Sequence, residues 1–146
     1  MKKAFGNLLR IMVLATILSL AGLVMSGAVM AWPCKVSHDG TVTDKVSGLM
    51  WQQETAGPMN WDAAMNYAAG LNLGGKTGWR LPTKEELVGL YLSPCKVRMS
   101  VGDCYWSSTL HAPDTSYAWI VNFSIGLGST NVKPRRYFVR AVRPGQ

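Results

Sequence analysis

The sequence predicts one α+β domain that follows an apolar N-terminal segment, and three observations lead to this prediction. Residues 1–31 contain no acidic residue and end in a long uncharged stretch, which distinguishes them from the rest of the chain. The remainder has two segments with helical periodicity between groups of short strand-like segments, an order typical of α+β folds rather than of alternating βαβ folds. A length of 146 residues is enough for one domain and short for two.

Residues 1–31 have the pattern of a secretory signal peptide. Three basic residues come first, residues 11–31 carry no charge, and small residues near Ala31 offer a cleavage site before residue 32. The uncharged stretch is also long enough to span a bilayer, so an uncleaved anchor is the alternative. We expect cleavage and export to the periplasm, the cell surface or the medium, with membrane association only if the segment is retained. Residues 32–146 then form the single domain.

Turn residues predict three short strands ahead of the helices. Asp39-Gly40 is a favoured two-residue hairpin turn, and it lies between the strand-like segments 35–38 and 41–44. A Ser-Gly turn then leads into a third strand over residues 49–52.

Two helices are expected after these strands. Asn60 can cap the first helix, over residues 61–71, where apolar residues recur every three or four positions. The second helix begins at Thr83, because Thr83 and Glu86 have the spacing of a capping box just before an apolar run. Pro82 keeps the chain extended where it enters this helix.

The C-terminal part of the chain favours strands. Segments 105–109, 117–124 and 137–143 are rich in aromatic and β-branched residues, which fit a half-buried sheet. Residues 126–134 lie between the last two segments and are expected to form a loop.

Basic residues near the C-terminus form the candidate binding site. The whole chain has a formal charge of +7, but only 16% of its residues are charged, and no acidic residue follows Asp114. Arginine side chains pair with sulfate, phosphate and carboxylate groups through two parallel hydrogen bonds. The candidate ligand-binding residues are Lys133, Arg135, Arg136, Arg140 and Arg143. The alternative is a solvated basic edge that resists aggregation.

The cysteines predict one disulfide bond. Cys34, Cys95 and Cys104 all follow the N-terminal segment, and an exported protein meets oxidising conditions. The preferred bridge joins Cys95 to Cys104, because it closes a short polar loop; Cys34 is then free or links to a second chain. Pairing of Cys34 with one of the other two is the alternative. Three cysteines without zinc-ligand spacing and two histidines do not predict a metal site.

Aromatic and helix-start residues are expected to have structural roles. Arg80 is expected to bond backbone carbonyls or an acid such as Asp44, with binding of an anionic ligand as the alternative. Alternation along residues 105–109 places Tyr105 and Trp106 on opposite faces, of which one must meet the core; an aromatic face for sugar stacking is the alternative. The residues expected to be structural are Trp51, Trp79, Arg80, Pro82, Thr83, Tyr105, Trp106, Ser107 and Trp119.

Three blocks of sequence resemble the Lcl C-terminal domain family. The blocks are residues 39–51, residues 78–87, and Tyr105 to Thr109 together with the later Ala-Trp and Val-Arg-Ala-Val-Arg segments. The resemblance implies a C-type-lectin-like fold of the type found in formylglycine-generating enzymes, with two helices and a small antiparallel twisted sheet. It also implies an exported bacterial protein or surface domain. The founding member of this family is an adhesin whose C-terminal domain is associated with binding sulfated glycans.

One departure from the family pattern concerns a disulfide. Family members often carry a cysteine in the first helix and another in the final strand, where this chain has Ala68 and Ala141. We therefore expect packing, rather than a covalent bond, to hold this helix against this strand.

No arrangement of residues predicts an enzyme. The sequence lacks a G-x-S-x-G motif and a serine with a nearby His-Asp pattern, and it lacks the metal-binding cysteine pair of formylglycine-generating enzymes. The acidic residues are too scattered for a calcium site. We therefore expect a non-catalytic binding module without a cofactor, for a sulfated or otherwise anionic polysaccharide or an envelope polymer. A structural or interaction subunit of a bacterial surface assembly is the alternative, and nucleic acid is not an expected partner.

Overall fold

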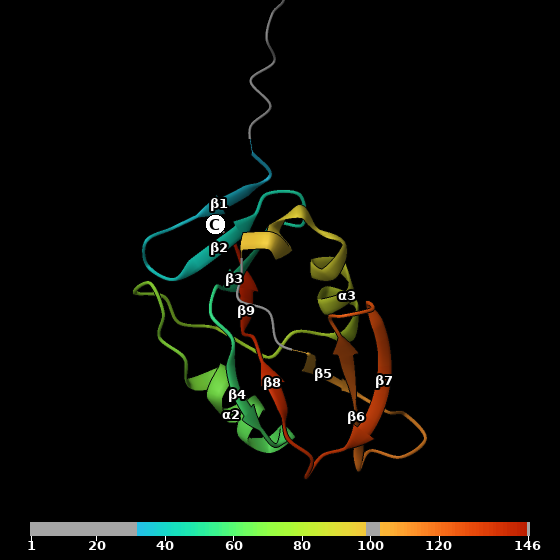
Figure 1. The fold of residues 1–146 in the computed structure, drawn as a ribbon. Coiled ribbons are helices and arrows are strands. Elements are labelled where there is room, and N and C mark those ends of the chain that lie inside the picture. The colour runs from blue at the N-terminus through green and yellow to red at the C-terminus, as the bar shows by residue number, and fades with distance from the viewer. Residues whose placement is uncertain (1–31, 99–102, 146) are drawn as a thin grey trace, which may run out of the picture. The chain divides into compact units, whose positions relative to one another are not determined.

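The computed structural model describes residues 32–98 and 103–145, so the signal-peptide and anchor predictions for residues 1–31 lie outside the described residues. This part of the chain contains two α-helices, one 3-10 helix and nine strands in two sheets (Figure 1). The predicted α+β class is therefore confirmed. Within the described ranges, no helix is long and apolar enough to cross a bilayer.

The first sheet is antiparallel, with the strand order β1-β2-β3-β9. Its predicted N-terminal strands are present, but the connection between the first two is longer than a two-residue turn. The reason is that Ser37 N–H donates to Thr41 O, while the Asp39 carboxylate accepts from the backbone and hydroxyl of Thr41. Gly40, with φ of +82°, takes the left-handed conformation in this turn. The strands are β1 (Cys34–Val36), β2 (Thr41–Asp44), β3 (Leu49–Gln52) and β9 (Val142–Pro144).

The second sheet has the order β4-β8-β5-β6-β7, and only the β5–β8 pair is parallel. Its edge strand β7 corrects the prediction of a loop over residues 126–134. β7 pairs with β6 along its whole length, from Tyr117 opposite Val132 to Asn122 opposite Leu127. The strands are β4 (Ala56–Met59), β5 (Cys104–Leu110), β6 (Tyr117–Asn122), β7 (Leu127–Val132) and β8 (Tyr137–Val139).

The predicted strand over residues 137–143 is divided in the structure. β8 joins the second sheet, whereas β9 joins the first, and Arg140 and Ala141 lie between them. The chain changes sheets at this point because Gln52 N–H donates to Ala141 O and the Gln52 side chain accepts from Ala141 N–H.

Both helices begin where the sequence predicts. In α2 (Trp61–Gly70), the Asn60 side chain accepts from Ala63 N–H. In α3 (Lys84–Leu92), the predicted capping box is complete, since Thr83 accepts from the backbone of Glu86 and the Glu86 side chain accepts from the backbone of Thr83. A short 3-10 helix, η1 (Pro94–Arg98), follows α3.

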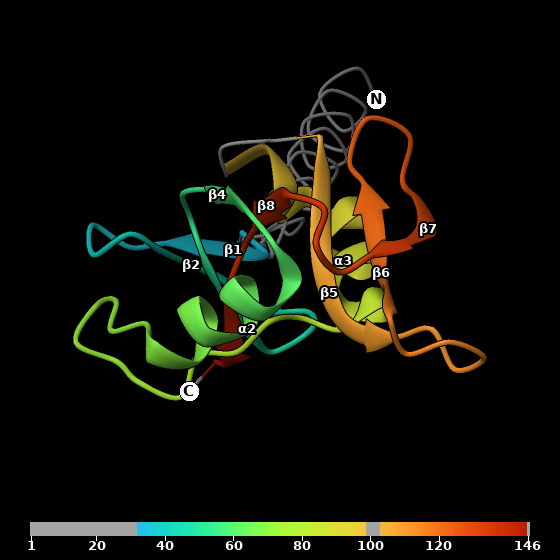
Figure 2. The same cartoon turned by 90° about the horizontal axis from the view of Figure 1, so that it is seen from below.

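Strand β5 lies between two hydrophobic clusters, so both of its faces are buried. Tyr105 belongs to the cluster that includes Leu87 and Leu90 of α3, whereas Trp106 belongs to the cluster that includes Ala68 of α2. Figure 2 shows α3 and α2 on opposite sides of β5. The predicted alternation of faces and the expected packing against the core are confirmed, and both faces meet the core rather than one. With Tyr105, Trp106 and Ser107 all fully buried, no face of β5 is available for sugar stacking at these residues.

Packing holds α2 against the segment between β8 and β9, where the chain changes sheets. Ala68 and Ala141 are both fully buried in the same cluster. The structure therefore places a pair of small apolar side chains where the family resemblance implied a disulfide, as expected from the sequence.

The disulfide joins Cys34 to Cys95, which corrects the preferred Cys95–Cys104 prediction and confirms the open alternative. Cys95 is fully buried on η1, which lies against β1 and β2, whereas Cys104 begins β5 and packs on the cluster around Trp106. Cys104 is the free thiol. Cys34 is consequently not available to link a second chain.

Candidate functional site

The predicted basic cluster is split in space, because its members lie on segments that belong to different sheets. Three residues share the β7–β8 connection, one is buried between β8 and β9 where the chain changes sheets, and one lies on β9. In that order the residues are Lys133, Arg135 and Arg136, then Arg140, and finally Arg143.

Arg140 is a structural residue, which corrects its prediction as a ligand-binding residue. Only 2% of Arg140 is exposed, and its guanidinium donates to Gln52 O and Gln53 O, each at 2.6 Å, and to the Thr55 hydroxyl at 2.9 Å. Burial lowers the pKa of the Arg140 guanidinium, while the hydrogen bond to Tyr105 opposes this effect. Arg140 remains charged at neutral pH and holds the β3–β4 connection against the segment between β8 and β9.

Lys133, Arg135 and Arg136 form a basic surface that we call the basic loop. Lys133 Nζ lies 4.2 Å from the centroid of the Trp61 ring, and the Lys133 backbone oxygen accepts from Trp61 N–H, so the loop is fixed to the start of α2. Arg136 donates to Pro58 O at 2.7 Å and is exposed, as is Arg135. In the described part of the chain, the ion pairs involve other residues, so the positive charge of this loop is not neutralised by a carboxylate.

A cleft of about 320 Å³ borders the basic loop. Its lining includes Cys104, whose thiol has its pKa raised by burial and by the nearby Asp103 carboxylate. A raised pKa keeps more of a thiol in its protonated, less nucleophilic form. The lining residues are Pro58, Asp103, Cys104, Arg136, Tyr137 and Phe138.

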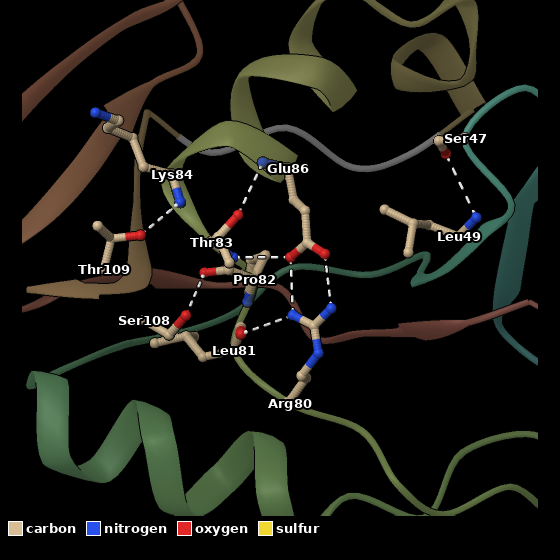
Figure 3. A network of polar contacts seen from close by, with 10 residues as sticks. All are labelled: Ser47, Leu49, Arg80, Leu81, Pro82, Thr83, Lys84, Glu86, Ser108 and Thr109. Carbon is tan, nitrogen blue, oxygen red and sulfur yellow. Dashed lines mark hydrogen bonds and ion pairs between the residues drawn. The ribbon is translucent and has the colours of Figure 1, made fainter.

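Arg80 is paired within the protein, but not with Asp44 as the sequence suggested. Its guanidinium donates to both oxygens of Glu86, at 2.8 and 2.6 Å, and to Leu81 O at 3.4 Å (Figure 3). The buried Asp44 carboxylate instead accepts from the β2–β3 turn and from the Ser93 hydroxyl. These contacts within the protein confirm the structural role that was expected for Arg80.

The segment from Trp79 to Thr83 is held on both sides. Trp79 and Leu81 are buried in the cluster around Trp106, and Pro82 O accepts from the backbone and hydroxyl of Ser108. The hydroxyl of Thr109 accepts from the first N–H of α3 (Figure 3). These contacts fix the orientation of α3 on β5.

The pairing of Glu86 with Arg80 predicts a pH dependence of stability. Hydrogen bonds from Arg80, followed by the bond from Thr83 N–H, hold the pKa of Glu86 below its ordinary value of 4.5. A group whose pKa falls on folding stabilises the protein above its ordinary pKa, and this contribution disappears as the pH falls through the folded-state pKa. We expect Glu86→Gln, which keeps the cap, to lower the free energy of unfolding by about 1 kcal/mol near neutral pH.

Urea denaturation at two pH values tests this expectation. The difference between Glu86→Gln and the parent protein should be smaller at the lower pH, because protonation of the carboxylate removes the contribution of its charge. Glu85→Gln is the matched control for a lost charge in the first turn of α3, because Glu85 is 70% exposed and its ion pair with Lys84 is longer, at 3.4 Å. A stability difference for Glu86→Gln that is the same at both pH values would contradict the role of the charge.

Trp119 was expected to be a structural residue of the core, but the structure places it outside the core. Trp51, Trp79 and Trp106 are buried. Trp119 is half-buried on β6, with Lys84 Nζ 4.1 Å from its ring centroid and the His111 ring 6.4 Å away. The neighbouring Ala118 is fully buried instead. Because Lys84 covers the indole, Trp119 is not an open platform for a sugar ring.

An apolar groove of about 500 Å³ between α3 and the β2–β3 turn has no counterpart in the sequence prediction. Val46 in the turn is 81% exposed and Leu92 at the end of α3 is 74% exposed. Leu49 also lines this groove, on the side opposite α3 (Figure 3). The only signal in the sequence is the position of these apolar residues at a turn and at a helix end, where polar residues are usual.

Over residues 32–98 and 103–145, no three His, Cys, Asp or Glu side chains lie close enough to hold a metal ion. The basic loop itself offers hydrogen-bond donors and positive charge. The arrangement is suited to binding an anionic group.

Comparison with known proteins supports the resemblance seen in the sequence. No curated protein matches this chain. The family model of the Lcl C-terminal domain matches residues 40–143, a range that contains both helices, the basic loop and Arg143. Because this match extends over most of the chain, the protein belongs to the Lcl C-terminal domain family.

Proposed function

We propose that this protein is an exported, non-catalytic binding module that holds an anionic glycan or envelope polymer at the basic loop. The observation that carries the proposal is that Arg135 and Arg136, which are exposed, share one connection with the half-buried Lys133. None of the three is paired with a carboxylate in the part of the chain that the structure describes. The disulfide and the signal-like residues 1–31 support export, because disulfides persist in oxidising compartments.

The geometry of the basic loop favours a polymer with repeated negative charges. The loop is short and fixed at Trp61 and Pro58, so its cations are held in place before a ligand arrives. Such preorganisation reduces the entropy lost on binding. The adjoining cleft provides room for a sugar ring beside Arg136 and Tyr137. Binding through exposed charges is screened by salt, so the affinity should fall as salt is added.

Removing charge from the basic loop tests this function. We expect Lys133→Gln/Arg135→Gln to weaken binding to immobilised heparin, a sulfated polysaccharide, by about tenfold, since each exposed ionic contact contributes about 0.5–1 kcal/mol. The matched control is Lys35→Gln/Lys45→Gln, which removes the same charge from exposed residues of the first sheet and its turn. Equal losses in both variants would show that net charge, rather than the basic loop, determines binding.

The apolar groove supports a second candidate function, that of an interaction subunit in a surface assembly. Val46 and Leu92 expose large apolar surfaces that a protein partner could cover. Under this alternative, Val46→Gln/Leu92→Gln should release the protein from the envelope fraction of its host while heparin binding is unchanged. Linkage through Cys34 plays no part in it, because Cys34 is bonded to Cys95.

A further inference from the structure

A second pocket, which we call the Arg143 pocket, lies between the loop before Trp79 and strand β9. It has a volume of about 300 Å³, at the small end of the usual range for ligand sites. Its lining contains two cationic side chains and no carboxylate. The lining residues are Met50, Gly75, Lys76, Thr77, Arg143 and Pro144. Figure 1 shows β8 between the β7–β8 connection and β9, and none of the lining residues belongs to the basic loop, so this pocket is separate from that loop.

The backbone and an aromatic ring hold Arg143 in place. Arg143 lies opposite Met50 in the β3–β9 pair, and its guanidinium carbon is 5.9 Å from the centroid of the Trp79 ring. Trp79 is only 2% exposed, and its indole N–H donates to Lys76 O at 2.8 Å. The ring that supports Arg143 is therefore itself fixed to the loop that forms the other wall of the pocket.

Arg143 has donors that the protein does not satisfy. Its Nε is buried and has no hydrogen-bond partner, and the ion pairs in the described ranges do not include Arg143. A buried donor without an acceptor costs about 1–3 kcal/mol, so such a group in a native protein calls for an explanation. Because no acceptor in the described part of the chain holds this Nε, the charge of the guanidinium is available to an anion in the pocket.

The other charges near the pocket do not oppose an anion. Lys76 Nζ lies 3.4 Å from Asp39 Oδ2 and donates to Gly74 O at 3.0 Å, so the Asp39 carboxylate is already paired. Arg143 then provides the uncompensated charge. The contrast with Arg80 and Arg140 is informative, because those two arginines have their acceptors within the protein.

The wall opposite Arg143 is built from glycine. Leu73 and Lys76 exchange backbone hydrogen bonds of 3.1 Å around a turn in which Gly74 and Gly75 have φ of +61° and +66°. No atom lies within 4 Å of the position that a Cβ of Gly75 would occupy. The open space at Gly75, with the Thr77 side chain beside it in the lining, leaves room for a small polar group.

We propose that the Arg143 pocket binds one sulfate or phosphate monoester group, carried by a sugar unit. The Arg143 guanidinium holds two oxygens of the ester through paired N–H donors, the geometry that arginine favours for such anions. This site goes beyond the proposed function, because it needs neither the basic loop nor a long polymer. A monoester bound here lies on a different part of the surface from a polymer bound at the basic loop.

An NMR titration of the full chain tests the proposal directly. Glucose 6-sulfate and glucose 6-phosphate serve as probes, with sodium chloride at matched ionic strength as the reference. We expect saturable shifts of the Arg143 Nε–H signal and of the Trp79 indole N–H, which Trp79→Phe assigns. A saturable shift with either ester supports the proposal, and the ester that binds more tightly identifies the source of the group. Shifts that are absent with both esters, or equal to those in chloride, overturn it.

Two variants separate this site from the basic loop. Arg143→Gln should weaken binding of the ester by about tenfold, or about 1.4 kcal/mol, whereas Lys133→Gln/Arg135→Gln should leave the Trp79 shift unchanged. Unchanged ester binding in Arg143→Gln overturns the proposal, even if the basic loop binds heparin as expected. Because the parent protein is tested against chloride first, the result does not depend on the stability of Arg143→Gln.

Discussion

Replacing Arg140 with methionine is expected to lower the free energy of unfolding by about 3–5 kcal/mol, the cost usually seen when a buried charged network loses one partner. Methionine fills a similar volume but donates no hydrogen bond. The Gln52 and Gln53 oxygens would lose donors at 2.6 Å in a buried or partly buried setting. Thr55 would lose its bond from the guanidinium at the same time. Urea denaturation followed by tryptophan fluorescence measures the change.

Arg136→Met is the matched control for Arg140. Arg136 also donates to a backbone oxygen, Pro58 O, but it is exposed, so water can replace the lost bond. We expect its effect on stability to be below about 1 kcal/mol. Similar losses in the two variants would contradict the assignment of Arg140 as the buried anchor. If Arg140→Met folds but no longer binds heparin, Arg140 is a ligand-binding residue rather than a structural one.

The helices were predictable because their signals are local. Thr83 and Glu86 satisfy each other across a single turn, and Asn60 satisfies an N–H three residues away. Such contacts depend on spacing along the chain, which the sequence displays directly.

Strand β7 was not predictable for the opposite reason. Its residues include Gly128, Ser129 and Asn131, which individually favour turns, and most of its side chains are exposed or half-buried. The strand forms because β6 offers a complete edge of backbone donors and acceptors. Pairing with a neighbour, rather than the composition of the segment, determines its structure.

The location of the basic residues in space was not predictable from the sequence either. Arg140 and Arg143 belong to one short basic stretch of sequence, yet the chain passes from the second sheet to the first between them. Burial then makes Arg140 a structural residue, while Arg143 reaches a separate pocket. Charge counts predicted a basic surface, but they could not show that it has two parts. The preferred disulfide failed likewise, because a short separation along the chain did not bring Cys104 to Cys95.

Removing the Cys34–Cys95 disulfide is expected to lower the free energy of unfolding by about 4 kcal/mol. This value follows from the entropy that the unfolded chain regains when a loop of 61 residues is no longer closed. Cys34→Ala/Cys95→Ala makes the change without leaving unpaired thiols. Cys104→Ala is the control, because it removes a cysteine that is already free, and its expected cost is about 1 kcal/mol.

The position of the bridge also predicts which part of the fold loosens. β1 is an edge strand of three residues, and the remaining strand contacts that hold it come from its pairing with β2. Without the disulfide, hydrogen exchange should become fast first in β1, because a short edge strand has few other contacts to resist local opening. The central strand β5 should keep its protection until the whole domain unfolds, since clusters on both faces bury it. Equal loss of protection in β1 and β5 would show instead that the bridge stabilises the domain as one cooperative unit.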